Sequence, residues 1–456
     1  MKKLLVIVIL FGIHNLLFAQ ETEPDELITI TGDTLAGSLV NEENIREVIG
    51  NVVIIQGDVT ITCDIAKQFL QRNEVELIGN VVCVQDTVTI KTAKGYYFGN
   101  NRIAKSDVGV LLDDGRMKLD AVHGYYYFNE QRAFFYEKVC LYDSINTLKS
   151  DTLNYYYDNN KAVAISNVEA RDTSSVIYAD SLVHFRDSLV TFGYHHVRIV
   201  DTTDSLIITG EYLEDFGQKD STRITGDPIL FSVDTDSTGR SDTLFIKSKE
   251  LIALKDSLGS NFIALDSVKI IRGEFASVNE RTYMFRNEDR IFTYKNEDDK
   301  IPPVLWYENS QLVGDTVNIF LVEDELDRID ITSNGTITSE NKEYYFRYDQ
   351  VSGNIIKIYF RGGDLNLTEI FGSVLSIYYT YDDGKPNGLI KSSSNNAKIF
   401  FEDKKVVDVR LYGSPSSEYH PENLVEGKEK DFTLPSFLIF NNRPIKEKMI
   451  SEWNKR

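Results

Sequence analysis

A unit of about 29 residues recurs from near the beginning of the chain to beyond its midpoint, and it constrains the fold more than any other feature. Each copy is typical of two short strands joined by a tight turn. Large apolar residues close the first half of each copy at spacings of 29, 30, 29, 28, 31 and 38 residues; they are Phe69, Phe98, Phe128, Tyr157, Phe185, Phe216 and Leu254. This period predicts an array in which each unit packs only on its neighbours.

The second half of each copy contains a strand, a polar pair and another short strand. The residue after the polar pair is almost always valine, at Val52, Val81, Val108, Val139, Val168, Val197, Pro228 and Val268. Polar pairs of the Gly-Asn, Ser-Asp, Glu-Lys and Ser-Asn type suit a bulge, where Gly or Asn can adopt a positive φ. Because side chains alternate between the faces of a strand, the pattern predicts a sheet folded over on itself, with an apolar lining inside.

The composition agrees with an all-β protein, since 25 Tyr and 25 Phe stand beside only 9 Pro. The best helix candidate is the end of the chain, from Pro444 onward. The repeat pattern predicts a β-repeat domain over 21–273, an irregular connector over 274–303, a second β-repeat region over 304–414 and a loose C-terminal cap or tail over 415–456.

Residues 1–20, MKKLLVIVILFGIHNLLFAQ, place two lysines before a short apolar run and are typical of a secretory signal peptide. A retained membrane anchor is the alternative. The formal charge is −21, and removal of Lys2 and Lys3 with the signal peptide would make it −23. Such a charge excludes nucleic acid and anionic membrane surfaces as ready partners.

Nothing in the sequence indicates catalysis, a cofactor or a metal site. The six histidines are scattered, and the pair His195–His196 lacks a third ligand at metal-binding spacing. Phosphate-binding loops and nucleophile motifs are not found. The three cysteines argue against a disulfide framework, so Cys63, Cys83 and Cys140 are expected as buried thiols, with a Cys63–Cys83 bridge as the alternative.

The Gly-Asn-Val kinks at 50–52 and 79–81, the strands QGDVTITCD and QDTVTIKTA, and the 29-residue phase resemble the OstA-like (organic solvent tolerance) family, of the LptA and LptD N-terminal-domain type. The resemblance covers 28–271, and the stretch from Pro303 is similar to longer OstA-like proteins. It implies a folded-over antiparallel β-jellyroll, or β-taco, whose interior carries the acyl chains of lipopolysaccharide across the periplasm. It also implies that such domains join edge to edge.

An apolar slot would shield acyl chains, because each methylene exposed to water costs about 0.8 kcal/mol. The residues expected to line this lipid-binding groove are Ile61, Leu77, Val81, Cys83, Val88, Ile90, Val108, Val110, Leu112, Val139, Leu141, Val163, Ile165, Val190, Phe192, Val197 and Ile199. The alternative is that these side chains fill a closed core. Aromatic runs that begin at Tyr96, Tyr125 and Tyr155 are interpreted as cross-strand packing, with a lipid- or sugar-contacting ladder as the alternative.

We therefore expect a periplasmic protein, associated with the outer membrane, that binds and transports lipopolysaccharide for outer-membrane assembly. Its expected partners are lipopolysaccharide and other transport proteins, which would add strands at the first strand, 28–30. Head-to-tail self-association is a further expectation. The alternative function is that of a structural or adhesive β-repeat protein with a closed core and a protein-binding surface.

Overall fold

The computed structural model describes residues 27–203, 205–235, 241–256, 259–322 and 325–455. The predicted signal peptide lies outside these residues. The described chain is almost entirely antiparallel β-sheet, as the sequence predicts. It divides into two compact units, the first formed by 27–115 with 125–129 and the second by 116–124 with 130–455.

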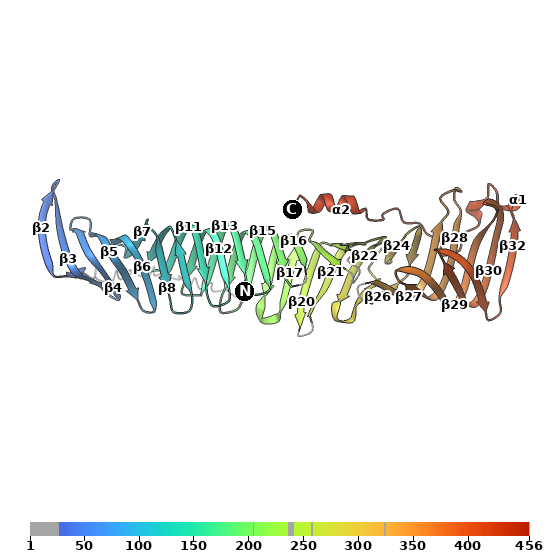
Figure 1. Cartoon of the computed structure of the whole chain (residues 1–456), viewed down its shortest axis with the longest axis horizontal. Helices are drawn as coiled ribbons and strands as arrows, with labels where there is room; N and C mark the ends of the chain where they lie inside the picture. Colours follow the sequence, from blue (N-terminus) through green and yellow to red (C-terminus); the bar gives the residue numbers. More distant parts are fainter. Residues whose placement is uncertain (1–26, 204, 236–240, 257–258, 323–324, 456) are drawn as a thin grey trace, which may run out of the picture. The chain divides into compact units, whose positions relative to one another are not determined.

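The strands follow one another closely along the chain (Figure 1). The first ten are β1 Thr29–Thr31, β2 Thr34–Val40, β3 Glu43–Gln56, β4 Val59–Phe69, β5 Glu74–Gln85, β6 Val88–Phe98, β7 Ile103–Ser106, β8 Val110–Asp113, β9 Lys118–Ala121 and β10 His123–Tyr127. The next eleven are β11 Arg132–Tyr142, β12 Thr147–Tyr156, β13 Lys161–Arg171, β14 Ser175–Phe185, β15 Val190–Asp201, β16 Leu206–Phe216, β17 Ser221–Thr225, β18 Ile229–Thr235, β19 Ser241–Lys247, β20 Glu250–Asp256 and β21 Gly259–Arg272.

The remaining strands are β22 Phe275–Phe285, β23 Arg290–Tyr294, β24 Val304–Tyr307, β25 Ser310–Val313, β26 Thr316–Val322, β27 Glu325–Glu340, β28 Tyr348–Arg361, β29 Asp364–Asp382, β30 Lys385–Glu402, β31 Lys405–Tyr412 and β32 Ser416–Pro421. The helices are α1 Glu422–Val425 and α2 Lys446–Trp453, with 3₁₀ turns η1 Gly217–Lys219, η2 Arg286–Glu288 and η3 Glu429–Asp431. Helix α2 confirms the helix predicted after Pro444.

The predicted polar pairs form kinks in the long strands. Two consecutive residues adopt positive φ at Gly50–Asn51, Gly79–Asn80, Glu137–Lys138, Ser166–Asn167, His195–His196, Gly226–Asp227, Asp266–Ser267, Ser333–Asn334, Gly372–Ser373 and Gly413–Ser414. The ladder shifts its register at each kink that lies within a strand, for example between Ile78 and Val81 of β5. The pair Ser106–Asp107 differs, because the chain there breaks between β7 and β8 and Gly109 takes the positive φ of 95°.

Left-handed backbone is costly for residues other than glycine, and side chains on the neighbouring strand offset that cost. Asn80 donates its side-chain amide to Asp64 at 2.9 Å, and His196 lies 2.9 Å from Asp180. The same type of bond joins Asn51 to Asp33, Asn167 to Asp151 and Asn334 to Asp315. An acidic side chain therefore holds the kink in several copies, and this explains the His195–His196 pair without a metal.

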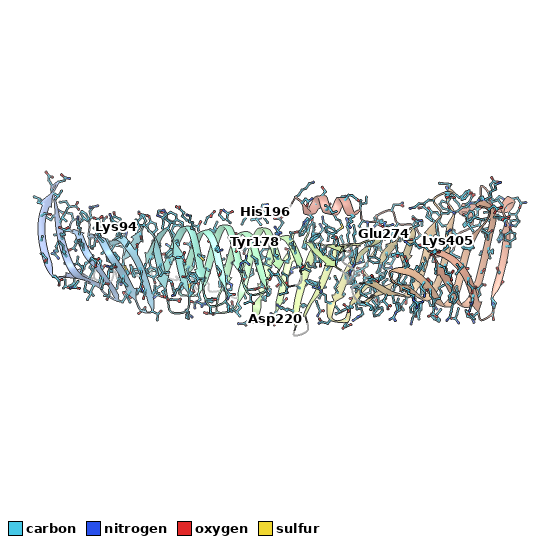
Figure 2. The ribbon with its side chains drawn as sticks, viewed as in Figure 1. Lys94, Tyr178, His196, Asp220, Glu274 and Lys405 are labelled. Carbon is cyan, nitrogen blue, oxygen red and sulfur yellow. The ribbon has the colours of Figure 1, made fainter. Side chains whose placement is uncertain are left out.

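The kinks divide the sheet of each unit into two walls that face each other. In the first unit, wall A consists of 43–49, 65–69, 74–78, 94–98 and β7, and wall B consists of 52–56, 59–63, 81–85, 88–92 and β8. In the second unit most strands cross the kink and so contribute to both walls. Figure 2 shows His196, at a kink, and Asp220, at a turn between strands, at opposite edges of the ribbon.

In the second unit, two segments depart from the pattern in which one strand crosses a kink and contributes to both walls. After β16, wall A continues through β17 and β20, whereas wall B continues through β18 and β19. After β22, wall A continues through β23 and β26, and wall B continues through β24 and β25. The range 274–303, expected as an irregular connector, thus holds β22 and β23, whose alternation is masked in the sequence by charged residues at the turns.

The C-terminal segment, residues 422–455, lies on the outer face of wall B in the second unit. Figure 1 shows it running back from β32 and ending with α2 beside earlier strands. Met449 of α2 packs in a cluster with Ile229, Phe245, Ile271, Ala276, Val278, Val304 and Trp306. Residues 415–456, expected as a loose cap or tail, therefore contain an edge strand, β32, and a segment packed on an apolar sheet face.

Two glutamines bind the backbone of this segment. The Gln311 side chain donates to the carbonyl of Leu438 at 2.6 Å and accepts from the amide of Phe440 at 2.8 Å. Gln350 bonds in the same two ways to Phe432 and Leu434. Each side-chain amide thus satisfies one donor and one acceptor of a chain that has no strand partner there.

Candidate functional site: an apolar slot between two walls

The candidate site is the slot between walls A and B. In the first unit its lining comes from both walls, and no member is more than 8% exposed. Wall A contributes Val48, Ala66, Val75, Leu77, Tyr97 and Ala104, and wall B contributes Val52, Ile54, Val59, Ile61, Cys63, Val81, Cys83, Val88, Ile90, Val110 and Leu112. Apolar side chains from the two walls therefore fill the slot of this unit.

The mouth of the slot in the first unit is closed by a repeated pair of side chains, which we call the clasp. The Tyr97 hydroxyl, in wall A, donates to Gln56 at the end of wall B at 2.6 Å, and Gln56 donates to the carbonyl of Gly99 at 3.2 Å. One repeat later, the Tyr126 hydroxyl lies 3.4 Å from Gln85. The clasp consists of these two Tyr–Gln pairs.

A partly exposed ionic contact between Arg102 and Asp58 supports the clasp. Gln85 also donates to Asp58 at 2.7 Å, and Arg102 contacts the same carboxylate. Hydrogen bonds from Gln85 and Arg102 outweigh the opposing effect of burial and hold the pKa of Asp58 below its usual value. Burial raises the pKa of Tyr97 to about 12, so its hydroxyl keeps the proton that it donates.

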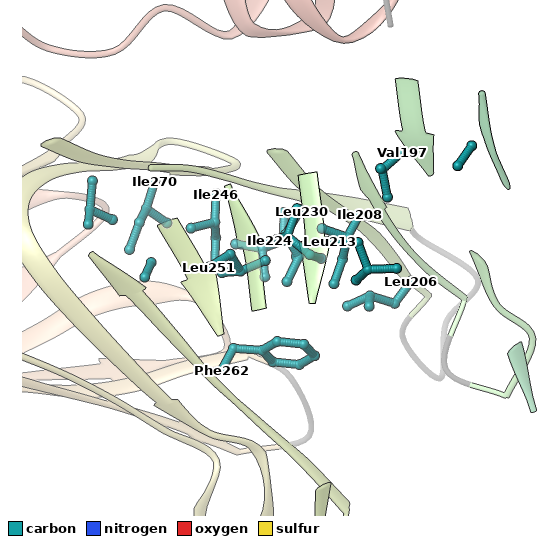
Figure 3. Close-up of a cluster of buried hydrophobic side chains, with 14 residues drawn as sticks. Val197, Leu206, Ile208, Leu213, Ile224, Leu230, Ile246, Leu251, Phe262 and Ile270 are labelled. Atoms are coloured by element: carbon teal, nitrogen blue, oxygen red, sulfur yellow. The ribbon is translucent and has the colours of Figure 1, made fainter. Parts of the chain in front are cut away.

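In the second unit, two large clusters fill the slot. The first joins wall A residues such as Leu213 and Leu251 to wall B residues such as Leu230 and Ile246 (Figure 3). The second continues among β23 to β30, with Ile329, Ile356 and Ile370 completely buried. The apolar lining therefore extends well beyond the regular repeats of the sequence.

Most of the residues predicted to line the groove do face inward. Ten are buried: Ile61, Leu77, Val81, Cys83, Val88, Ile90, Val110, Leu112, Val139 and Val197. Leu141 and Ile199 are only partly buried, but they lie directly opposite the buried Leu119 and Ile208, so they share the inner face. The inward orientation is thus present for twelve of the predicted residues, while a lipid-binding role for them remains a prediction.

Five predicted residues point away from the slot. Val108 and Ile165 are 56% and 46% exposed. In β13 the residues that face inward are Ala162 and Ala164, so Val163 and Ile165 lie on the outer face. In β15 the inward positions are Thr191 and Gly193, so Val190 and Phe192 also lie outside.

The error has a physical reason. In β13 and β15 the residue after the kink, Val168 or Val197, is buried, whereas the four predicted residues before it lie outside because the inner face of these two strands carries small residues. Val108 lies outside because the chain breaks between β7 and β8 there instead of forming a kink. Neighbouring strands of the same wall compensate, because Leu153 and Leu182 pair with Ala164, and Leu182 and Leu213 pair with Gly193, all on the inner face. The inner face of these strands is found by alternation, in steps of two residues back from the valine that follows the kink.

The clasp was not predicted, although its signal is present. Gln56 and Gln85 are 29 residues apart, as are Tyr97 and Tyr126. Within the aromatic runs, Tyr97, Tyr126 and Tyr155 are buried, whereas the residues directly next to them are partly exposed. The runs thus place one tyrosine per copy inside the slot.

All three cysteines are free thiols in the structure. Cys63 and Cys83 lie inside the slot on neighbouring strands, and burial raises the pKa of their thiols to about 11 and about 12, respectively. Because the thiolate is the reactive form, both should react slowly while the slot is closed. The Cys63–Cys83 bridge considered from the sequence is not formed.

The fold and the slot define a folded-over β-repeat protein with an apolar interior. Residues 25–155 match the family model described as OstA-like protein, the family that the kinks and strands of this part of the chain resemble. No curated protein matches the chain. No helix among the described residues is long and apolar enough to cross a membrane.

Among solved structures, the chain is similar to LptH of Pseudomonas aeruginosa, described as the LptA-homologous periplasmic component of the conserved lipopolysaccharide transport device. The match has 15% identity, covers 31% of this chain and 83% of LptH, and has a TM-score of 0.17. A superposition at this score supports no argument about function.

Proposed function

We propose that this protein is a periplasmic, non-catalytic carrier that holds the acyl chains of lipopolysaccharide between walls A and B during outer-membrane assembly. The observation that carries the proposal is the continuous apolar lining of each unit, supplied in register by both walls. The OstA-like match of residues 25–155 agrees with it. Acidic and polar residues on the outer faces keep the protein soluble in water, while the interior provides an apolar environment for acyl chains.

Binding of an acyl chain requires the walls to separate, because in the first unit the lining residues of the two walls already bury one another. An acyl chain would replace wall-to-wall contacts with contacts of the same apolar kind, so the exchange costs little in contact energy. The larger cost lies in breaking the clasp at Gln56 and Gln85. A ligand opens the slot only if it binds the open form better than the closed one, and an acyl chain meets this condition.

The two free edges of the sheets supply docking sites in this proposal. Among the residues that the structure describes, β1 and β2 pair only with β3, which leaves their other sides without a strand, and Leu35 and Leu39 of β2 are 62% and 67% exposed. Toward the C-terminus, within the described part of the chain, β31 and β32 pair only with β30. Unpaired edges recruit further strands, so transport partners would extend the sheet at these positions.

The rival function is that of a structural or adhesive repeat protein, and the filled slot of the first unit favours it. Photo-crosslinking separates the two. A benzoylphenylalanine residue is placed in cells at Val88 or Val110, inside the slot, and at Val84 or Ile165, which are exposed. We expect lipopolysaccharide adducts at the two inner positions and none at the outer ones.

The absence of adducts at both inner positions, with normal expression and folding, would contradict the carrier function and favour the structural one. Equal adducts at all four positions would contradict an internal site as well, because they would report only surface contact.

A further inference from the structure

Strands β22 and β23 of the second unit place polar side chains inside the slot. On the inner face of β22, Ser277, Asn279 and Thr282 are 2%, 1% and 1% exposed. Asn279 donates its side-chain amide to the Ser277 hydroxyl at 3.0 Å, and the Thr282 hydroxyl donates to Asn279 at 2.8 Å. Thr293 of β23 pairs with Thr282 and is 2% exposed. We call these four residues the polar rung.

The polar rung lies between the two apolar clusters of the slot. On one side it pairs with Ala264 of the first cluster, and on the other side with Val317 of the second. Phe275 and Met284, near the two ends of β22, pack against both clusters. Because the kink edge lies between these ends, the lining stays apolar toward the mouth of the slot and is polar only toward the kink.

The rung contains a hydroxyl that the protein does not satisfy. The Thr293 hydroxyl has no hydrogen-bond partner among the residues that the structure describes. Thr293 shares the inner face of wall A with Ile291, two residues earlier in β23, which belongs to the second cluster. A buried polar group without a partner is costly and rare in folded proteins. A free donor and acceptor therefore face an otherwise apolar part of the slot.

A cavity of about 210 Å³ lies one residue pair away from this hydroxyl, at the mouth of the slot. Its apolar lining includes Leu230, Leu244, Phe262, Met284 and Ile291. Met284 pairs with Ile291, and the next inner pair toward the kink is Thr282 with Thr293. Successive inner residues of a strand lie about 7 Å apart. A chain that enters through the cavity would therefore meet the Thr293 hydroxyl with atoms close to its head.

We propose that the cavity and the Thr293 hydroxyl form a subsite for an acyl chain that carries a hydroxyl group near its head. The inference deepens the proposed function and rests on it, since it names the kind of acyl chain that the slot prefers. A hydroxyl on the chain both donates and accepts, so it satisfies the Thr293 hydroxyl inside the slot. A plain chain leaves Thr293 unpaired, and a site with an unpaired buried polar group discriminates against such a ligand.

The test compares two ligands, 3-hydroxydodecanoic acid and dodecanoic acid, below their micelle-forming concentrations, with the purified full-length mature protein. Both carry the same carboxylate and the same chain length, so charged side chains at the rim of the cavity affect them equally. Calorimetry is expected to show at least about threefold tighter binding of the hydroxylated chain. Equal affinity of the two ligands, or binding of neither, would overturn the proposal.

Variants of Thr293 locate the preference. Thr293→Val removes the hydroxyl and keeps the shape, so the two ligands should bind it with equal affinity. Thr293→Ser keeps a hydroxyl and should retain the preference. The matched control is Thr368→Val, since Thr368 is also 2% exposed and shares the inner face with Ile370, but lies on β29, between β28 and β30. A preference that persists in Thr293→Val, or that Thr368→Val also abolishes, would overturn the role of Thr293.

Failure of this inference and failure of the proposed function are distinguishable. If the two ligands bind equally while crosslinkers at Val88 and Val110 still capture lipopolysaccharide, the carrier function stands and only the hydroxyl subsite is wrong. If the crosslinks fail while the preference depends on Thr293 as expected, the subsite stands and the carrier function is wrong.

Discussion

At the scale of single residues, the chemistry of this protein is concentrated where polar side chains face an apolar interior. Gln56 and Gln85 are 4% and 5% exposed, and each is bonded to groups of both walls or of a turn. A buried amide that loses its partner costs about 1–3 kcal/mol. Closure of the first unit's slot therefore depends on the specific hydrogen bonds of the clasp, and not only on contact between apolar side chains.

Replacement of Tyr97 by Phe is expected to loosen the first unit's slot. It removes the hydroxyl that donates to Gln56 and keeps the ring that packs against Phe128. The free thiols of Cys63 and Cys83 report opening, because both are buried in the slot. We expect their labelling by a maleimide under native conditions to accelerate about tenfold, corresponding to about 1.4 kcal/mol.

The matched control is Tyr96→Phe, the neighbouring tyrosine, which lies on the other face of β6. Labelling of Cys140, which is only partly buried, serves as the reference for reagent activity. Equal labelling rates in Tyr97→Phe and Tyr96→Phe would show that the clasp does not control opening.

Asp349 makes folding dependent on pH. Burial raises its pKa to about 6, although the amide of Tyr379 donates to it at 2.9 Å. Between pH 4 and 6 the folded state keeps a proton that the unfolded state releases, so stability falls as pH rises through this window. Asp349→Asn keeps the acceptor and removes the charge, so it should be more stable than the native chain at pH 7.5, by at most about 3 kcal/mol.

Denaturant unfolding at pH 4 and pH 7.5 measures this effect. The advantage of Asp349→Asn should nearly vanish at pH 4, and the exposed Asp382→Asn should show none at either pH. An advantage of the same size at both pH values would rule out ionisation as its cause.

At the scale of elements, the kink is the device that turns a meandering sheet into two walls. Gly79 has a φ of 78°, which strains a residue with a side chain, and a Cβ added there would clash with the carboxylate of Asp64. Gly79→Ala should therefore destabilise the protein by at least about 2 kcal/mol. Gly37→Ala, in β2, meets nothing within 4 Å and should change stability by less than about 1 kcal/mol.

Urea unfolding monitored by circular dichroism compares the two alanine variants. Similar stabilities for Gly79→Ala and Gly37→Ala would show that the kink tolerates a side chain, and that its glycines are not required for the bend.

The C-terminal segment supplies a second element-scale prediction. Met449 of α2 is 4% exposed in the outer cluster, whereas the adjacent Ile450 is 37% exposed. Met449→Asp would bury a carboxylate among Phe245, Val304 and Trp306, so α2 should leave the sheet. Trypsin should then cut after Lys446 and Lys448 at least tenfold faster, while Ile450→Asp should be cut at the native rate. A native rate for Met449→Asp would show that the cluster does not hold α2.

Sequence patterns predicted the strands, the kinks and the folded-over sheet, because these depend on local alternation and on residues that tolerate positive φ. They also predicted the inner face of β5, β6 and β8. They failed at Val163 and Phe192, where the inner face carries alanine, threonine and glycine and a size rule selects the wrong side. The packed C-terminal segment could not be predicted, since its partners Gln311 and Gln350 lie some 80–130 residues earlier in the chain.

At the scale of the whole molecule, the two units share the two-walled β-sheet but differ in how regularly they follow the repeat and in what covers their walls. The first closes its slot with side-chain hydrogen bonds and follows the 29-residue period strictly. The second unit departs from the period after β16 and after β22, and it covers the outside of wall B with the chain's own C-terminal segment. The segments that depart from the 29-residue repeat are thus the ones that add structure, such as the packed C-terminal segment, to the two-walled sheet.

The free edges lead to a prediction about assembly. Leu35 and Leu39 lie on the exposed strand β2, and Val407 and Val409 of β31 are 53% and 49% exposed at the other edge of the fold. Edge strands that carry exposed apolar residues favour pairing with another chain, so β2 of one copy should pair with β31 of a second. We expect the sedimentation coefficient of the mature protein to rise with concentration, and the double variant Leu35→Lys with Leu39→Lys to remain monomeric.

The control exchanges exposed apolar residues that are not on these edges, Val108→Lys with Ile165→Lys, and should associate like the native chain. Because lysine on an edge strand opposes pairing through its charge and its hydration, the edge variant should lose association even at high salt, where long-range repulsion is screened. Monomeric behaviour of the native chain at all concentrations would contradict edge pairing between copies. Equal loss of association in both double variants would assign it to general surface hydrophobicity instead of to the strand edges.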